Sequence, residues 1–153
     1  MNIRRAEPRD VDFLLALLHD EETRPFLGSE VTVDVENDAW FVGEVEGERV
    51  GCVTYVVLSE RHGIVEAQRF AIDPRFRGRG YGLELARAFQ RHVLRDLGFH
   101  RIELKVYGFN ARAIAHAEAS GYIREGVKRR AYLRDGEWVD AVLFALLAED
   151  LDE

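Results

Sequence analysis

Three glycines alternate with other residues in the stretch Arg75–Gly82, which reads Arg-Phe-Arg-Gly-Arg-Gly-Tyr-Gly and precedes a predicted helix. Glycine has no Cβ, so successive backbone N–H groups in such a loop can converge on one bound group. The start of a helix adds unpaired N–H donors and a partial positive charge. The arginines of the stretch carry guanidinium groups, which suit phosphate oxygens. The stretch therefore predicts a binding site for a phosphate or a pyrophosphate.

The spacing of the glycines separates this stretch from the common nucleotide-binding loops. The sequence has no Gly-Lys-Ser/Thr of a P-loop, and Gly78-x-Gly80-x-Gly82 departs from the Gly-x-Gly-x-x-Gly of dinucleotide-binding folds. The spacing Arg75-x-x-Gly78-x-Gly80 matches the Arg/Gln-x-x-Gly-x-Gly/Ala motif with which the GNAT (GCN5-related) N-acetyltransferases hold the pyrophosphate of coenzyme A. In this motif the chain resembles that family.

The spacing of apolar residues predicts an α+β fold of about seven strands and four helices. Strands are expected at 2–6, 39–45, 49–58, 64–72, 101–106, 122–133 and 137–147, and helices at 10–18, 21–27, 81–97 and 110–120. Asp10 is expected to cap the first helix. The polar segment 28–38 is either one wall of a substrate groove or a solvated loop. The glycine stretch joins the fourth strand to the third helix, so this strand and helix position the predicted phosphate site.

The strand Ile64–Ile72 carries the residues that lie nearest to the glycine stretch. Successive side chains of a strand point to opposite faces, so Glu66, Gln68, Phe70 and Ile72 are expected to share one face. This places a carboxylate on the same face as two apolar side chains beside the predicted phosphate site.

Composition limits the range of functions. The chain has 153 residues, of which 47% are hydrophobic, and this predicts one domain spanning 1–153 with a full core. A net charge of −7 argues against general nucleic-acid binding. An apolar run long enough to span a membrane and the apolar core of a signal peptide are both missing from the sequence, so no membrane association and a cytoplasmic location are expected. The single cysteine, Cys52, is expected in the core, and no metal site is predicted.

The resemblance to the GNAT family extends over most of the chain. The segment Asn110–Ile114 followed by Gly121-Tyr122 matches the family's Asn-x-x-Ala/Ser-Ile and Gly-Phe segment, and residues 124–140 are similar to the ribosomal-protein and polyamine acetyltransferase branches. The resemblance implies the family's single-domain fold, with a mixed central sheet that splays between its fourth and fifth strands. It implies an N-acetyltransferase with acetyl-CoA as co-substrate and no metal. Many members of the family dimerise, so a homodimer is a further possibility that it raises.

The resemblance also implies which residues bind the coenzyme. Backbone groups of Phe70, Ala71 and Ile72 would bond the pantetheine amides, and Asn110 would contact coenzyme A. The pyrophosphate would lie against the glycine stretch, which contributes Arg75, Arg77, Gly78, Arg79, Gly80, Tyr81 and Gly82.

Acetyl transfer to an amine requires the uncharged amine, yet an alkylammonium titrates near ~10.4, so at neutral pH only about one molecule in a thousand is free base. A carboxylate in the groove, usually acting through water, helps to remove the proton. Glu66 falls where the histone-modifying branch of the family has its glutamate base; the alternative is an exposed glutamate at the sheet edge. Other members carry their glutamate where this chain has Lys105, and Glu103 is a second choice two residues earlier.

The family tyrosine that protonates the leaving thiolate is missing, because its position is occupied by Ala117. Tyr132 is the candidate replacement if it faces the groove; the alternative is an aromatic packing residue. The neighbouring His116 is interpreted as a surface residue. Trp40 and Trp138 either shape the acceptor site or pack elsewhere.

The sequence thus predicts an acetyl-CoA-dependent N-acetyltransferase that moves the acetyl group to a primary amine by direct attack on the thioester. The acceptor is a protein N-terminus, a polyamine or another small-molecule or peptide amine. The alternative is a non-catalytic acyl-CoA-binding sensor or regulatory module.

Overall fold

The computed structural model describes residues 1–19 and 32–151 of the chain. The helix expected at 21–27 and the first part of the polar segment 28–38 lie outside these residues. Within the described part of that segment, Asp34 accepts hydrogen bonds from the backbone of Glu36 and Asn37 in an exposed turn. This turn is a solvated loop, one of the two alternatives that the sequence left open.

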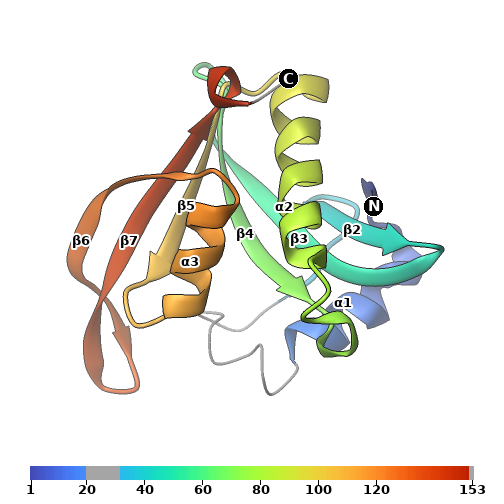
Figure 1. The fold of residues 1–153 in the computed structure, drawn as a ribbon, viewed down its shortest axis with the longest axis horizontal. Coiled ribbons are helices and arrows are strands. Elements are labelled where there is room, and N and C mark those ends of the chain that lie inside the picture. The colour runs from blue at the N-terminus through green and yellow to red at the C-terminus, as the bar shows by residue number, and fades with distance from the viewer. Residues whose placement is uncertain (20–31, 152–153) are drawn as a thin grey trace.

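A seven-stranded mixed sheet forms the centre of the molecule (Figure 1). In spatial order its strands are β1 (Asn2–Arg5), β2 (Ala39–Val45), β3 (Glu48–Ser59), β4 (Ile64–Ile72), β5 (Arg101–Tyr107), β7 (Glu137–Leu147) and β6 (Ile123–Arg134). Neighbouring strands are antiparallel, except for β4 and β5, which are parallel. The predicted α+β class and sheet are therefore confirmed.

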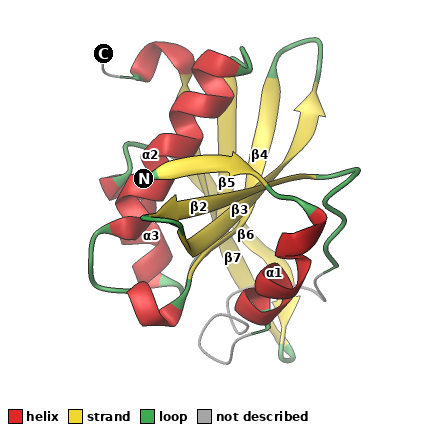
Figure 2. Ribbon diagram, turned by 90° about the vertical axis from the view of Figure 1, so that its right-hand side faces the viewer, coloured by secondary structure: helices red, strands yellow, loops and turns green. Residues whose placement is uncertain are grey.

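Three α-helices cover the sheet in the described part of the chain, α1 (Val11–Leu18), α2 (Tyr81–Arg91) and α3 (Ala111–Ala119). A five-residue π-helical segment, His92–Asp96, continues α2. Helices α2 and α3 lie on one face of the sheet and α1 lies on the other, as the two views in Figure 1 and Figure 2 show.

The core consists of two layers, one on each face of the sheet. Phe41 and Val53 face α2 and join a cluster with Phe89, whereas their neighbours in the chain face α1. Three of the four leucines of α1 are buried because they recur at helical spacing: Leu14, Leu17 and Leu18 are all at most 4% exposed, whereas Leu15 is half-buried. This division of neighbouring residues between the two layers follows from the strand geometry, in which successive side chains point to opposite faces.

Asp10 precedes α1 as expected, but its carboxylate does not cap that helix. The carboxylate is fully buried, receives two hydrogen bonds from Arg4 at 2.7 and 2.9 Å, and lies 3.2 Å from the guanidinium of Arg49. It also accepts a hydrogen bond from the backbone N–H of Glu7. The Arg4 guanidinium holds the pKa of Asp10 well below its usual range. The carboxylate therefore ties β1 and β3 to the start of α1.

The parallel pair β4 and β5 separates after a short contact. Only Ile64–Glu66 of β4 pairs with Arg101–Glu103 of β5, although both strands continue further. Beyond this contact β4 remains paired with β3, and β5 remains paired with β7. This confirms the predicted splay, which leaves one edge of β4 without a neighbouring strand (Figure 1).

A bulge in β4 reverses the alternation of its side chains. The register with β3 shifts between Gln68 and Ala71, and Arg69 in this interval has a positive φ of 54°. Phe70 packs against the α2-side core, and the adjacent Ala71 packs against the α1-side core. The expectation that Glu66, Gln68, Phe70 and Ile72 share one face is therefore wrong. The bulge inserts one extra residue, so the second half of the strand faces the opposite way.

Candidate functional site

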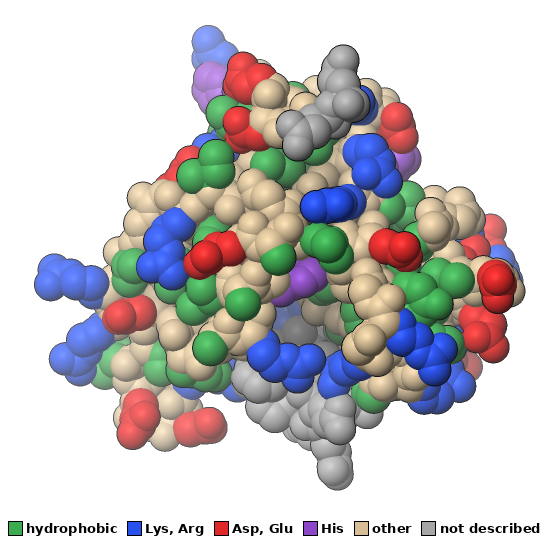
Figure 3. All heavy atoms as spheres, viewed as in Figure 1, with side chains coloured by type: hydrophobic (Ala, Val, Ile, Leu, Met, Phe, Trp, Pro, Cys, Tyr) green, Lys and Arg blue, Asp and Glu red, His purple; other side chains and the backbone are tan. Residues whose placement is uncertain are grey.

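A cavity of about 680 Å³ opens where β4 and β5 part. Its walls are β4 from Glu66 onward, the glycine loop, parts of α2 and α3, the end of β5 and single residues of β3, β6 and β7. Side chains from both faces of the sheet line it, so the cavity reaches through the gap between the two strands. The space-filling view in Figure 3 shows a hollow on the face that carries α2 and α3, with basic side chains at its rim.

The glycine loop forms the end of the cavity at the start of α2. Gly78 and Gly80 have positive φ values of 78° and 82°, a conformation in which other residues are strained. A Cβ placed on either glycine would meet no atom within 4 Å, so the space in front of the loop is open. Because the first turn of a helix leaves its N–H groups without intrahelical partners, Gly80 introduces a set of donors that faces this space.

Two of the three predicted loop arginines lie outside the cavity wall. Arg75 is paired with the carboxylate of Asp73, with 2.9 Å between Nη2 and Oδ2, and its side chain is 75% exposed. The guanidinium of Arg79 lies over the ring of Phe76, 5.6 Å from its centroid. Neither residue lines the cavity, so the structure does not bring them to the site that the sequence predicted for them.

Arg77 does line the cavity, and its Nε donates a hydrogen bond to the carbonyl of Ile72. The Arg-x-x-Gly-x-Gly spacing occurs twice in this stretch, and its second occurrence is Arg77-x-x-Gly80-x-Gly82. All three residues of the second occurrence line the cavity. The structure therefore favours the second register of the motif over the predicted one, Arg75-x-x-Gly78-x-Gly80.

The free edge of β4 provides backbone groups along the cavity. Phe70, Ala71 and Ile72 line the cavity, as predicted, on the edge that β5 has left. An unpaired strand edge is a row of N–H and C=O groups that an extended molecule can bond. Arg77 donates a hydrogen bond to the carbonyl of Ile72. Just before Phe70, the bulge at Arg69 interrupts the regular pairing of β4 with β3.

The start of α3 forms the opposite wall. The side-chain oxygen of Asn110 accepts a hydrogen bond from the backbone N–H of Ala113 at 3.1 Å, so it caps the helix as expected, and Asn110 also lines the cavity. Its contact with a coenzyme stays a prediction. Arg112 lines the cavity two residues later, although no motif in the sequence marks it.

His116 was interpreted as a surface residue, and that interpretation is wrong. It lines the cavity, and its ring lies 4.9 Å from the ring of Phe70. Burial lowers the pKa of His116, so its imidazole is neutral at neutral pH. Its spacing of three residues from Ala113 places both on one side of α3, and this helical spacing is the signal that could have identified it.

Glu66 lies in the cavity wall on the face of the sheet opposite α2. It is 8% exposed, so the alternative of an exposed edge glutamate is wrong. Its Oε1 accepts a hydrogen bond from Gln68 Nε2 at 2.8 Å, and its Oε2 lies 3.0 Å from Lys105 Nζ. The hydrogen bond with Glu66 raises the pKa of Lys105, which keeps the ammonium charged. Glu66 is therefore a buried carboxylate that is paired with a lysine.

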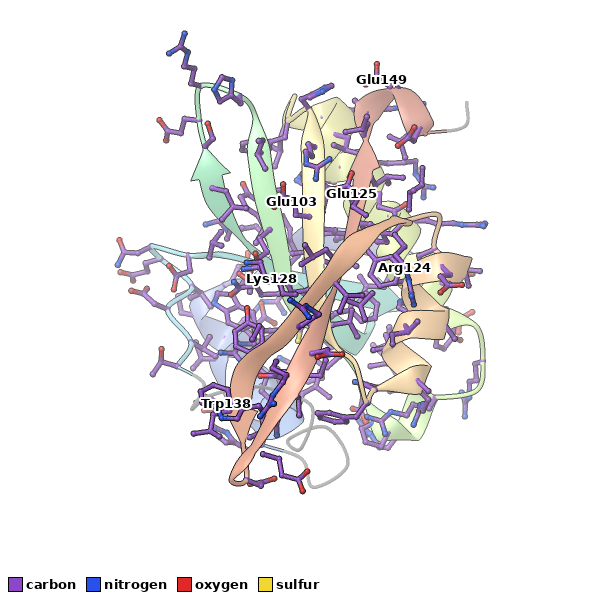
Figure 4. The ribbon with its side chains drawn as sticks, turned by 90° about the vertical axis from the view of Figure 1, so that its left-hand side faces the viewer. Glu103, Arg124, Glu125, Lys128, Trp138 and Glu149 are labelled. Atoms are coloured by element: carbon purple, nitrogen blue, oxygen red, sulfur yellow. The ribbon has the colours of Figure 1, made fainter. Side chains whose placement is uncertain are left out.

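The second-choice carboxylate, Glu103, does not line the cavity. Its Oε2 receives a hydrogen bond from Arg101 at 2.8 Å, and Arg101 also pairs with Glu125 of β6. Figure 4 shows Glu103 and Glu125 close together on the outer side of the sheet. This ion-pair cluster joins β5 to β6, and none of its three residues lines the cavity.

Tyr132 of β6 lines the cavity and interacts with Lys105, which connects it to Glu66. Its ring also packs at right angles to Tyr107, with centroids 5.8 Å apart. Tyr132 thus faces the groove and also packs against an aromatic residue. By contrast, Trp40 is in the α1-side core and Trp138 is 53% exposed, and neither lines the cavity.

Within residues 1–19 and 32–151, no group of three or more His, Cys, Asp or Glu side chains is arranged to hold a metal ion. None of the helices in the same residues is sufficiently long and apolar to span a membrane.

Comparison with known proteins identifies a family and relatives that are similar to this chain. The sequence model of the acetyltransferase (GNAT) family matches residues 9–122. The chain is 21% identical over 164 residues to the SPbeta prophage-derived uncharacterized N-acetyltransferase YokL of Bacillus subtilis, with 99% of this chain and 92% of that protein covered. It is 33% identical over 102 residues to the L-amino acid N-acetyltransferase AaaT of Escherichia coli, with 66% and 63% covered.

Solved structures with the same fold include two acetyltransferases. Spermidine N-acetyltransferase from Vibrio cholerae, in complex with CoA and spermine, superposes with a TM-score of 0.85 at 20% identity, covering 97% of this chain and 96% of the other. Ribosomal-protein-alanine N-acetyltransferase from Brucella melitensis superposes with a TM-score of 0.76 at 22% identity, covering 96% and 99%. At these identities the likeness is one of fold.

Proposed function

The chain belongs to the acetyltransferase (GNAT) family, and from this premise we propose that it moves the acetyl group of acetyl-CoA to a primary amine in the cavity between β4 and β5. The observation that carries the proposal is the parting of the parallel strands β4 and β5 at the glycine loop. It brings an anion site, an unpaired strand edge and a buried carboxylate to one cavity.

The glycine loop fits the pyrophosphate of the coenzyme. Gly78 and Gly80 leave open space where any other residue would have a side chain, and the N-terminus of α2 favours negative charge there. Arg77, which is in the cavity wall, would add a guanidinium to the phosphate oxygens. Arg75 has no part in this proposal, because Asp73 holds its side chain outside the wall.

The free edge of β4 fits the pantetheine arm. Backbone groups of Phe70, Ala71 and Ile72 would bond its amides as a neighbouring strand would, and Asn110 would contact it from the other wall. Acetyl-CoA supplies the acetyl group as a thioester, whose carbonyl carbon an uncharged amine attacks. A backbone N–H of this edge that points at the carbonyl oxygen would stabilise the negative charge that develops there.

Glu66 would accept the proton of the acceptor ammonium, directly or through a water molecule. Gln68 and Lys105 each engage one of its oxygens, and an ionised carboxylate has about four acceptor positions, so acceptor capacity remains. Lys105 also keeps Glu66 in place. This pair is consistent with a positioned base rather than a mobile surface side chain.

Tyr132 would give its hydroxyl proton to the leaving sulfur in place of the tyrosine that Ala117 has replaced. Its position in the cavity wall beside Lys105 supports this role.

The relatives support a primary amine as the acceptor. The names of the similar proteins refer to spermidine, to L-amino acids and to an alanine of a ribosomal protein. These acceptors differ in size and charge but each presents a primary amine. The acceptor of this protein is proposed to be a small-molecule or peptide amine of this kind.

A thiol-release assay tests the proposal. Purified protein is mixed with acetyl-CoA and, separately, with polyamines, amino acids and peptides that have a free N-terminus, and the released coenzyme thiol is followed with time. We expect thiol release that requires both the protein and an amine, together with acetylated amine detected by mass spectrometry. Tight binding of acetyl-CoA without turnover on any of these amines would reject the proposal and favour a coenzyme-binding module.

A further inference from the structure

The charged side chains of the cavity wall are predominantly basic. In the described part of the chain, the wall contains one acidic residue, Glu66, and four basic residues, Arg69, Arg77, Lys105 and Arg112. Lys105 pairs with Glu66 and compensates its charge. Arg77 is assigned above to the coenzyme pyrophosphate, so Arg69 and Arg112 remain as the excess positive charge that an acceptor meets, in a protein whose net charge is −7.

Arg69 differs in its interactions from Arg4 and Arg101, two other partly buried arginines. Arg4 pairs with Asp10 and Glu44, and Arg101 pairs with Glu103 and Glu125. Within the described residues, the guanidinium of Arg69 makes no hydrogen bond or ion pair, although the residue is half-buried in the cavity wall. A guanidinium that is partly removed from water without a carboxylate partner is unfavourable unless a ligand supplies the anion.

The backbone at Arg69 is also unfavourable for its residue type. Its φ of 54° lies in the left-handed region, which arginine rarely occupies. Strained backbone of this kind is concentrated at binding and catalytic sites. Arg69 directly follows Gln68, and Gln68 donates to Glu66. The unpartnered cation and the predicted base are thus three residues apart on the same strand.

We propose that the acceptor carries a carboxylate as well as its amine, and that Arg69 binds this carboxylate while Glu66 receives the ammonium. This inference rests on the proposed function and names the acceptor class as amino acids and molecules of similar charge. Arginine binds a carboxylate through two parallel hydrogen bonds, which also fixes the orientation of the acceptor. A polyamine would bring its second positive charge toward Lys105 and Arg69, and like charges in a partly buried site repel.

Matched acceptors test the carboxylate. The kcat/KM values of common amino acids are compared with those of the corresponding carboxamides, of the amines that lack the carboxyl group, and of spermidine. We expect the best amino acid to exceed its carboxamide at least tenfold and to exceed spermidine by more. The Arg69→Gln variant should lose about 10- to 100-fold in kcat/KM for the amino acid but retain its KM for acetyl-CoA.

Two further variants separate this role from folding. Arg69→Gly removes the guanidinium while relieving the backbone strain, so it should fold at least as well as the parent and still lose the preference for a carboxylate. Arg61→Gln changes an exposed arginine in the turn between β3 and β4, which does not line the cavity, and should leave all rates unchanged. Arg69→Lys, which retains the charge without the bidentate geometry, should recover part of the preference.

Three outcomes would overturn the inference. A higher kcat/KM for spermidine than for any amino acid would show that the positive charge does not select the acceptor. An Arg69→Gln variant with an increased KM for acetyl-CoA and an unchanged acceptor preference would assign Arg69 to a coenzyme phosphate. A folded Arg69→Gly variant with the parental preference would remove Arg69 from acceptor binding. Failure of all amines, by contrast, would reject the proposed function itself.

Discussion

A single methyl group at Gly80 should separate coenzyme binding from folding. Gly80 has a φ of 82° at the start of α2, and a Cβ built on it would meet no protein atom within 4 Å. Alanine at this position should therefore lower the free energy of unfolding only by the cost of the left-handed backbone, about 1 to 2 kcal/mol. For a chain of this length, each kcal/mol lowers the melting temperature by roughly 2 to 4 °C. The Gly80→Ala variant should remain folded, with a melting temperature lower by about 2 to 8 °C.

The same methyl group would project into the space proposed for the pyrophosphate. If it displaces the phosphate from one backbone N–H, the loss of one hydrogen bond to a charged group is about 1.5 to 3 kcal/mol. This corresponds to a dissociation constant for coenzyme A that is roughly 10 to 150 times higher. Gly80→Asp should weaken binding further, because it places a negative charge against the phosphates, and its effect should decrease as salt is added.

Gly98 provides a matched control at the far end of the same helical segment. Its φ is 79°, a Cβ there also meets nothing within 4 Å, and the residue does not line the cavity. Gly98→Ala should therefore have the same backbone cost and bind coenzyme A as tightly as the parent protein. Isothermal titration calorimetry with coenzyme A measures binding, and thermal unfolding measures stability. Equal affinity in Gly80→Ala and Gly98→Ala would refute the assignment of the glycine loop to the pyrophosphate.

Other predictions concern the base, a buried ion pair and the cysteine. Glu66→Gln should lower kcat about 100-fold or more at neutral pH, and the gap should narrow as the pH rises and the amine loses its proton unaided; a ratio of rates that is constant with pH would remove Glu66 as the base. Asp10→Asn should lower the free energy of unfolding in urea by roughly 3 to 5 kcal/mol, because it leaves the partly buried Arg4 without its carboxylate. Folding lowers the pKa of Asp10, so its contribution to stability should be complete above about pH 4 and should be lost only as the pH falls below that value. Acid titration of the parent protein, followed by its unfolding, measures this loss. Burial raises the pKa of Cys52 to about 12, so iodoacetamide should label this thiol only after unfolding, as judged by mass spectrometry.

Most elements of the fold are predictable from the sequence because their signals are local. The leucines of α1, the alternation of β2 and β3, and Asn110 at the start of α3 depend only on residues near in sequence. The splay between β4 and β5 was predicted through the family resemblance rather than from the residues. No residue in either strand indicates where their pairing ends, since that point depends on what each strand contacts on its other edge.

The site was less predictable because it depends on geometry across the sheet. The family resemblance made Glu66 the candidate base, but its partner Lys105 is on β5 and only the parallel register brings the two together. Arg75 and Arg77 have equivalent motif spacing, and the difference is that Asp73 captures the first. Asp73 and Arg75 are only two positions apart in the sequence, but this spacing alone does not predict that they form an ion pair.

The bulge at Arg69 divides β4 into one segment for each of the two proposed substrates. In a regular strand, every second side chain from Glu66 to Ile72 would have faced the same way, and the predicted base would have been on the coenzyme side of the sheet. The extra residue leaves Glu66 and Gln68 on the α1 face while Phe70 turns to the α2 face, beside the glycine loop and α3. The donor and the acceptor can then approach the gap between β4 and β5 from opposite faces. The residue at the bulge carries the unpartnered guanidinium, so the backbone irregularity that divides the two halves of the site also places the group proposed to select the acceptor.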